Sequence, residues 1–223
     1  MTLDPAKDPS CVLALDWTEP SGSIAYDRSQ YGNNGTIYGA IRTKGIYSKA
    51  IQLDGIDDYV EVPESSSLSS ATDNSYEFTM LAWIKVFEDS SSEQIIISNP
   101  ERIGILPGLY PYFFTGLSNT TSVMTYTSTA IKTNKWYLIT GIFNHGNAYI
   151  YVNDVLKGSA LGSAETTRSL SQPTRIGVAS WDTSTYLFNG IIGSVRIYNR
   201  ALSEKEIRSL YYYGIKKLRR LPY

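Results

Sequence analysis

Cysteine and histidine are nearly missing from this chain of 223 residues, which contains only Cys11 and His145. A single cysteine forms no internal disulfide, and the two residues together cannot supply the ligands of a structural zinc site. Charged residues are scarce too, at 18%, and 20 basic residues stand against 21 acidic ones. Because the formal net charge is only -1, we expect no specific nucleic-acid binding.

Long apolar runs are also absent. No run reaches the roughly 18 residues of a membrane-spanning helix, so we expect no transmembrane segment. The first nine residues lack the basic start and apolar centre of a secretory signal. The sequence alone leaves three locations open: a cytoplasmic protein, a domain processed from a longer chain, or a virion component.

What the sequence does contain is a series of short β-prone segments. Clusters of Gly, Asn, Asp, Ser and Pro separate them, which is typical of an all-β sandwich and not of alternating strands and helices. A domain of about 200 residues is ordinary for that class. The strands that we predict span residues 12–17, 50–53, 59–62, 78–86, 94–98, 136–143, 148–152, 175–179 and 192–198. The serine-rich segment 65–70 is predicted to be a loop.

One helix is well specified near the end of the chain. Ser203 and Glu206 form a capping box, and Leu202 and Ile207 stand where a hydrophobic staple would form. Gly214 is predicted to end the helix in the left-handed conformation. We therefore expect a short C-terminal helix that closes one side of the sandwich.

The predicted strands and helix divide the chain into an N-terminal extension over residues 1–10, one domain over 11–214 and a basic tail over 215–223. The tail holds four basic residues: Lys216, Lys217, Arg219 and Arg220. The simplest interpretation is a solvated tail. The alternative is an arm that contacts an acidic partner.

No arrangement of catalytic residues stands out. The Glu-x-Asp-x-x-Glu pattern of β-sandwich glucanases does not occur, although glycoside hydrolysis needs two carboxyl groups at a fixed separation. The sequence has no Gly-x-Ser-x-Gly elbow and no glycine-rich phosphate loop. His145 lies in a predicted turn, and Cys11 is interpreted as a small buried residue. We therefore predict that the chain is not an enzyme.

Six segments, in order, resemble the LamG-like jelly rolls of the concanavalin A-like lectin/glucanase superfamily. They include the opening loop D-R-S-Q-Y-G-N-N-G-T, the word K-A-I-Q-L-D-G-I-D-D-Y-V-E-V-P, F-T-M-L-A-W-I-K, W-Y-L-I-T, Y-I-Y-V-N-D and the closing F-N-G-I-I-G-S-V-R-I-Y-N-R-A-L-S-E-K-E-I. The resemblance implies two antiparallel sheets stacked as a jelly roll. It does not imply one function, because the fold hosts lectins, adhesion modules, glucanases and spacers.

The resemblance also implies a calcium site near the opening loop. The matching positions are Asp27, Asn33 and Asn34, whose oxygens are of the kind that calcium prefers. An acid found in the family's closing segment is Gly193 here, which removes one supporting carboxylate. The alternative is a turn held by Asx hydrogen bonds without metal. Asp57 and Asp58 are interpreted as turn residues before the next strand.

Sugar recognition usually pairs an aromatic ring with a few polar groups. Trp181 lies in a polar loop and Tyr110 in a Gly/Pro-rich connection, so we expect exposed rings there. Trp17, Trp83 and Trp136 occupy predicted strands and are expected in the core. The candidates for ligand contact are Trp181, Asp182, Tyr186, Tyr110 and Tyr112.

The function that we predict is non-catalytic recognition of a glycan or a cell-surface partner through loops of the jelly roll. The alternative is a virion structural, decoration or attachment protein that uses the fold for assembly, and 18 tyrosines suit protein contacts as well. A glucanase-type enzyme is a third possibility. The resemblance favours an extracellular or virion-surface location.

Overall fold

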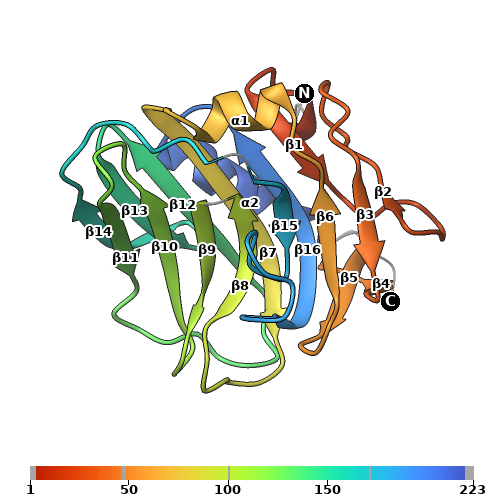
Figure 1. Cartoon of the computed structure of the whole chain (residues 1–223). Coiled ribbons are helices and arrows are strands. Elements are labelled where there is room, and N and C mark those ends of the chain that lie inside the picture. The colour runs from red at the N-terminus through yellow and green to blue at the C-terminus, as the bar shows by residue number, and fades with distance from the viewer. Residues whose placement is uncertain (1–3, 47–48, 100, 171, 219–223) are drawn as a thin grey trace.

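Two antiparallel sheets stacked face to face form the body of the molecule (Figure 1). The computed structural model describes residues 4–46, 49–99, 101–170 and 172–218, and within these ranges each sheet has eight strands. Sheet A has the order β14 (Val155–Leu161), β13 (Asn147–Val152), β12 (Tyr137–Asn144), β7 (Glu77–Val86), β16 (Asn189–Tyr198), β5 (Lys49–Asp54) and β4 (Ile41–Lys44), and β1 (Cys11–Leu15) also pairs with β16. Sheet B has the order β11 (Ser122–Tyr126), β10 (Tyr110–Gly116), β9 (Glu101–Leu106), β8 (Gln94–Asn99), β15 (Thr174–Ile176), β6 (Tyr59–Val62), β3 (Gly35–Tyr38) and β2 (Ile24–Ala25). The predicted fold class is confirmed.

The alternation of side chains along β7 shows how the layers are built. The even positions from Phe78 to Val86 enter the core between the two sheets. Leu81 and Trp83 point the other way and belong to a second apolar cluster on the outer face of sheet A. Because both faces of this central strand are covered, nearly the whole strand is buried.

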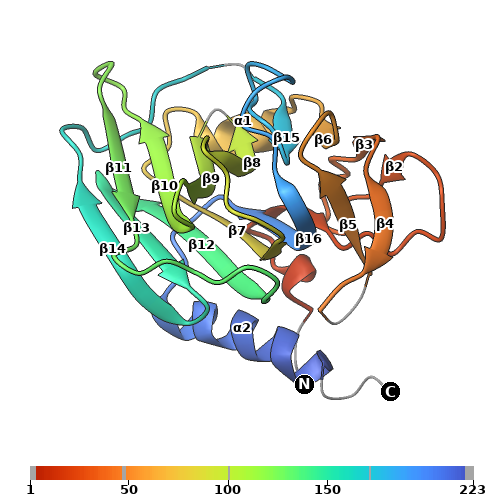
Figure 2. The ribbon, with the colours of Figure 1, turned by 90° about the horizontal axis from the view of Figure 1, so that it is seen from below.

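The second cluster is covered by the C-terminal helix α2 (Glu204–Leu218) and by the 3-10 helix η1 (Pro5–Lys7), as Figure 2 shows for α2 beneath sheet A. The predicted capping box is confirmed, since Ser203 N–H donates to Glu206 Oε2 at 2.8 Å and Glu206 N–H lies 3.4 Å from Ser203 Oγ. Leu202 and Ile207 are both buried in the cluster, as the staple requires. No helix among the described residues is long and apolar enough to cross a membrane.

The predicted end of this helix at Gly214 is wrong, because α2 continues to Leu218. Gly214 is buried against the indole of Trp83, and a Cβ there would lie 2.8 Å from the indole Cζ2. This glycine therefore permits a close helix–sheet contact and does not end the helix. Lys216 is exposed in the last turn, and Lys217 belongs to the helix. The other two residues of the predicted basic arm, Arg219 and Arg220, lie outside the described residues.

The N-terminal segment before β1 packs on the domain. Ala6 of η1 is buried in the cluster beneath α2. Asp8 forms an ion pair of 2.8 Å with Arg200, which also pairs with Glu206 at 2.7 Å. These contacts tie the N-terminal segment to the start of α2.

The serine-rich segment predicted as a loop contains a short helix, α1 (Ser66–Thr72). The Ser65 hydroxyl accepts a hydrogen bond from Leu68 N–H, and Leu68, Ala71 and Thr72 are buried. The serines on the other side are exposed or half-buried. Capping and burial of one face therefore outweigh the low helix propensity of serine.

Candidate functional site

A loop of twelve residues between β15 and β16 carries the exposed aromatic residues predicted from the sequence. This Trp181 loop (residues 177–188) crosses in front of sheet B in Figure 1. Trp181 is 48% exposed and Tyr186 is 38% exposed, and their ring centroids lie 6.3 Å apart in an edge-on arrangement. The backbone closes the base of the loop, since Phe188 N–H donates to Gly177 O at 2.9 Å.

Asp182 shapes the tip of this loop. Its carboxylate accepts hydrogen bonds from Ser184 N–H and Ser184 Oγ, both at 2.8 Å, and from Thr185 Oγ1 at 3.0 Å. These bonds lower the pKa of Asp182. The carboxylate therefore stays ionised, and we assign it the role of holding Trp181 and Tyr186 in place.

Arg175 on β15 anchors the first part of the loop. Its Nη1 donates to the carbonyl oxygens of Ala179 at 3.2 Å and Ser180 at 2.9 Å, and its Nη2 pairs with Glu61 at 2.8 Å. Ser180 also exchanges hydrogen bonds of 3.1 Å with the buried Ser98 hydroxyl of β8. Arg175 of β15 and Ser98 of β8 thus fix the loop on the outer face of sheet B, and Glu61 of β6 holds Arg175.

Arg102 on β9 lies beside the loop. Its guanidinium carbon lies 3.9 Å from the ring centroid of Phe114 and 5.1 Å from that of Trp181. Arg102 Nε donates to the Tyr112 hydroxyl at 3.2 Å and lies 3.7 Å from Glu93 Oε1. Arg102 and Phe114 are cross-strand partners, so both side chains stand on the same outer face.

Of the two tyrosines of β10 that were predicted to contact a ligand, one is exposed and the other is buried. Tyr112 is completely buried, so its prediction as an exposed ligand-contacting ring is wrong. Its ring packs over Gly104 on β9, where a Cβ would lie 2.7 Å from the ring, and burial raises its pKa. Tyr110 is 37% exposed, as predicted, but no ring contact joins it to the Trp181 loop among the described residues.

The opening loop is held by hydrogen bonds to Asp27. Its Oδ1 accepts from Ala14 N–H at 2.8 Å and Ser29 N–H at 2.9 Å, and its Oδ2 accepts from Ser29 Oγ at 2.6 Å and Asn33 N–H at 2.9 Å. Asn34 Oδ1 accepts from Asp27 N–H at 2.9 Å. These hydrogen bonds are those of an Asx-type turn. The calcium site implied by the resemblance stays a prediction.

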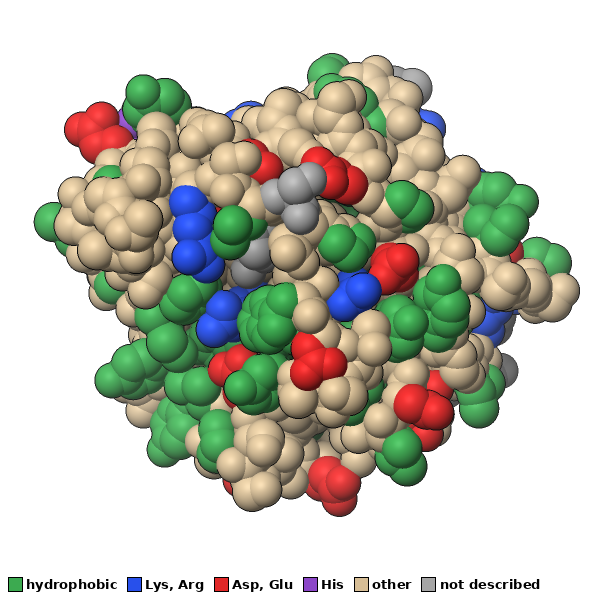
Figure 3. Space-filling view, in the orientation of Figure 1, with side chains coloured by type: hydrophobic (Ala, Val, Ile, Leu, Met, Phe, Trp, Pro, Cys, Tyr) green, Lys and Arg blue, Asp and Glu red, His purple; other side chains and the backbone are tan. Residues whose placement is uncertain are grey.

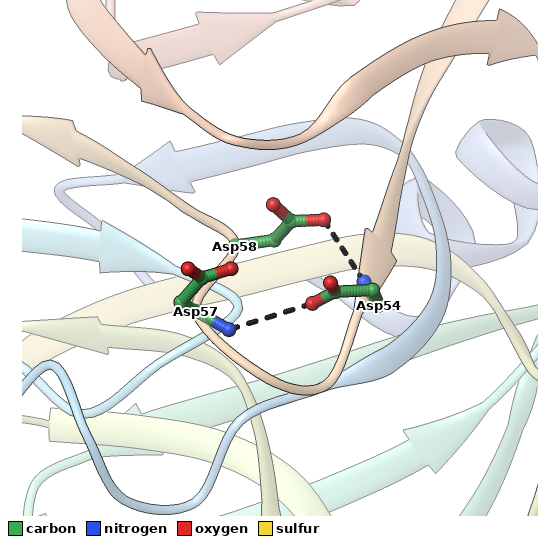
Figure 4. A group of neighbouring side chains, drawn as sticks. All are labelled: Asp54, Asp57 and Asp58. Atoms are coloured by element: carbon green, nitrogen blue, oxygen red, sulfur yellow. Dashed lines mark hydrogen bonds between the residues drawn. The ribbon is translucent and has the colours of Figure 1, made fainter.

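A second group of carboxylates lies in the turn between β5 and β6 (Figure 4). Asp54, Asp57 and Asp58 each offer an oxygen within 4.8 Å of the others. Asp54 Oδ1 accepts from Ile56 N–H at 2.8 Å, and Asp58 Oδ2 accepts from Asp54 N–H at 3.0 Å. Burial, together with the two neighbouring acids, raises the pKa of Asp58. The hydrogen bonds are those of an Asx-type turn.

The residues with catalytic chemistry are dispersed. Cys11 is buried, and burial raises the pKa of its thiol to about 12. His145 is exposed at the turn between β12 and β13, where its Nε2 lies 3.3 Å from Glu77. Glu101 on β9 is buried, and burial raises its pKa to about 8. These groups lie on separate parts of the described structure.

Sequence reasoning found the aromatic loop but missed the charged residues beside it. Arg102 lies in β9, a strand that the sequence analysis did not predict, and Arg175 was assigned only to a strand. The alternation of Arg102, Gly104 and Leu106 with buried isoleucines is a signal that could have placed Arg102 on an outer face. Nothing local to the sequence links Arg102 with Trp181.

Comparison with known proteins gives a family model and structural neighbours. The model described as the concanavalin A-like lectin/glucanases superfamily matches residues 54–208. No curated protein matches the sequence. Domain 4 of a GH43 extracellular arabinanase from Geobacillus stearothermophilus, solved with arabinotriose, is 18% identical with a TM-score of 0.67, over 91% of this chain and 98% of that one.

Larger proteins contain a similar domain. The binding domain of botulinum neurotoxin serotype G is 20% identical with a TM-score of 0.72, over 91% of this chain and 51% of that chain. The binding domain of botulinum neurotoxin DC, solved with SialylT, is 18% identical with a TM-score of 0.70, over 92% and 52%. The chain therefore spans about half the length of these toxin binding domains. At this level of identity the likeness shows the fold.

Proposed function

The chain belongs to the concanavalin A-like lectin/glucanase superfamily, and on that basis we propose that it is a non-catalytic carbohydrate-binding domain. In this proposal a glycan lies on the outer face of sheet B, beside the Trp181 loop. The fold is that of lectin-like binding domains, and the relatives include one solved with an arabinose trisaccharide and one solved with SialylT.

The exposed pair of Trp181 and Tyr186 carries the proposal. The indole of Trp181 is 48% exposed and lies beside the half-exposed ring of Tyr186, so two neighbouring aromatic rings are accessible to a ligand. The indole ring has the apolar surface that stacks against the apolar face of a pyranose. Asp182 and Arg175 hold the loop in shape before any ligand arrives, which reduces the entropy lost on binding.

The test is a glycan array probed with the whole chain, followed by calorimetry on the best ligand. Trp181→Ala should weaken binding about tenfold or more, which corresponds to about 1.4 kcal/mol. Tyr212→Ala is the matched control, because Tyr212 is 46% exposed on α2, on the opposite side of the sandwich. Equal affinities of wild type and Trp181→Ala for every bound glycan would contradict the proposed site.

A second candidate function is assembly through protein contacts, of the kind expected for a virion or attachment subunit. Strand β14 is at the edge of sheet A and exposes Val155, Leu156 and Leu161. An exposed apolar edge strand favours pairing with another chain. Light scattering over a concentration series tests this function: a dimer that Leu161→Lys dissociates supports it, and a monomer at every concentration contradicts self-assembly.

A further inference from the structure

We propose that the glycan held on this face carries a carboxylate, and that Arg102 and Arg168 form the subsite that recognises it. The inference rests on the proposed function and adds the chemical class of the ligand. It follows from the contacts of three arginines on the outer face of sheet B, which differ in how many of their donors are used.

Arg102 has one occupied edge and one free edge. Its Nε faces the Tyr112 hydroxyl and Glu93, and its guanidinium carbon lies 3.9 Å from the ring centroid of Phe114 and 5.1 Å from that of Trp181. Among the described residues, neither Nη atom has a hydrogen-bond acceptor. The side chain is 18% exposed. The two Nη groups therefore present parallel N–H donors, which is the geometry that binds a carboxylate in bidentate fashion.

Arg175 provides the contrast. Its Nε and Nη2 bind Glu61, and its Nη1 binds two carbonyl oxygens of the Trp181 loop. Its donors are used in shaping the loop. The Nη atoms of Arg102 bind no backbone carbonyl of the loop among the described residues, although Arg102 lies beside the Trp181 indole. The free edge of Arg102 is thus a feature that the loop architecture does not explain.

Arg168 brings a second guanidinium to the same face. It lies across Gly116, where a Cβ would come within 2.7 Å of the Arg168 Cζ. Gly116 follows Phe114 by two positions on β10, so it stands on the same face about 6.6 Å further along the strand. The buried Nε of Arg168 has no hydrogen-bond partner among the described residues. A glycine at this position makes room for the arginine on the surface.

The buried acid Glu101 interacts with Arg168, whose charge lowers the pKa of this carboxyl, but burial has the larger and opposite effect. Glu101 receives a hydrogen bond of 2.7 Å from Gly116 N–H, while its other oxygen has no partner among the described residues. Because burial raises the pKa of Glu101 to about 8, this carboxyl is largely protonated at neutral pH. The charge of Arg168 therefore remains available to an anion.

The surroundings suit an acidic sugar better than a bare anion. Figure 3 looks onto this face and shows basic side chains among hydrophobic ones near its centre. A pyranose stacked on Trp181 would place a ring carboxylate near Arg102, because the guanidinium lies 5.1 Å from the indole centroid. Glu93 works against binding, because its charge lies 3.7 Å from Arg102 Nε. Its removal is therefore expected to strengthen the interaction.

The primary test uses the wild-type chain and needs no substitution. The probes are an oligogalacturonate, sialyllactose, the carboxyl-reduced form of each, neutral lactose and a sulfated disaccharide, all measured by calorimetry. We expect at least one carboxylate probe to bind about tenfold or more tightly than its reduced form. Binding of the oligogalacturonate would indicate a uronate ligand, and binding of sialyllactose would indicate a nine-carbon acid sugar. Either result supports the subsite.

Substitutions then locate the subsite. Arg102→Lys keeps the charge but removes the planar fork, and it should abolish most of the preference for the carboxylate. Arg168→Gln should reduce it, and Glu93→Gln should raise affinity for the acidic probe about twofold or more while leaving the neutral probe unchanged. Arg208→Gln removes one positive charge from α2 as the matched control. Thermal melts establish that each variant is folded.

The possible outcomes separate this inference from the proposed function. Equal binding of acidic and reduced probes, lost in Trp181→Ala, would retain a carbohydrate-binding domain and overturn the carboxylate subsite. Binding of the sulfated probe without any carboxylate probe would overturn the assigned class. Binding of no saccharide at all would overturn both.

Discussion

At the scale of single residues, Gly214 lies inside α2, where glycine costs about 1 kcal/mol relative to alanine. The replacement Gly214→Ala should nevertheless destabilise the protein by about 1–3 kcal/mol, because the new methyl group would overlap the buried Trp83 indole. Urea unfolding measures the change. Ser209→Ala on the exposed side of the same helix is the control and should change stability little. A more stable Gly214→Ala variant would contradict the close contact.

Glu101 should make stability depend on pH. Burial raises the pKa of this carboxyl from 4.5 to about 8, so its contribution to stability is complete below pH 4.5 and declines as pH rises to about 8. Glu101→Gln stays neutral and keeps an acceptor for Gly116 N–H. The variant should therefore gain stability relative to wild type between pH 5 and 8 in urea unfolding.

The exposed Glu165 supplies the control for this measurement. Glu165→Gln should leave the slope of stability against pH unchanged. If Glu101→Gln follows the wild-type slope across the whole range, the buried carboxyl does not titrate there.

The sequence predicts single residues well where the local context decides exposure. Trp181 and Tyr186 lie among polar residues and are exposed, as predicted. Tyr112 was misjudged because Tyr-Pro-Tyr reads as a connection, whereas the residue belongs to β10 and its ring fills the space above Gly104. Whether a glycine on the next strand receives that ring depends on strand register, which the local sequence does not specify.

At the scale of elements, the start of α2 rests on its capping box. Ser203→Ala removes the hydroxyl that faces Glu206 and should cost about 0.5–2 kcal/mol in thermal or urea unfolding. The pKa of Glu206 is lowered to about 2, and the hydrogen bond from Arg200 is the largest cause. Stability from this carboxylate is present above its unfolded pKa and is lost as pH falls toward about 2. An unchanged melt of Ser203→Ala would show that Arg200 alone fixes this helix end.

The opening loop gives a prediction about calcium. Since Asp27 already has four protein donors, Asp27→Asn should lower stability by about 1–3 kcal/mol in EDTA as well as in calcium. Paired thermal melts of wild type and variant measure this. The calcium site implied by the resemblance stays a prediction. A rise in the wild-type melting temperature with calcium, lost in Asp27→Asn, would support that site.

Several strands were predicted close to their observed bounds, and others, including β9 and β10, were missed. The predicted strand at residues 59–62 matches β6, and 78–86 differs from β7 by one residue. Strand β10 was missed because Pro111 cannot donate to a ladder. The structure tolerates it because pairing with β11 begins only at Tyr112. Strand propensity therefore identifies core strands better than it identifies a strand that contains a proline, such as β10.

At the scale of the whole molecule, we expect no hydrolysis of β-glucans. The carboxyl pattern of the glucanases is missing from the sequence, and the acids near Trp181 are used to hold the loop or to pair with arginines. Reducing-sugar release should equal that of a heat-inactivated control. Release above that level, abolished by replacing a single Asp or Glu, would make the chain an enzyme.

The combination of residues in the candidate site arises only from tertiary pairing. Arg102, Phe114 and Trp181 come from β9, β10 and the Trp181 loop, and Arg168 comes from the connection before β15. Composition and periodicity predict the sandwich that brings them together. The order of strands in sheet B decides which of them become neighbours.

The sandwich has two unlike sides, with η1 and α2 on the outer face of sheet A and the Trp181 loop on the outer face of sheet B (Figure 2). A chain attached to a scaffold through its last helix would turn its arginine-bearing face away from the scaffold. Many copies fixed in this way would face a coated surface together, and each first contact would raise the effective concentration of the next. Several copies oriented in this way would together bind such a surface more tightly than one copy binds it.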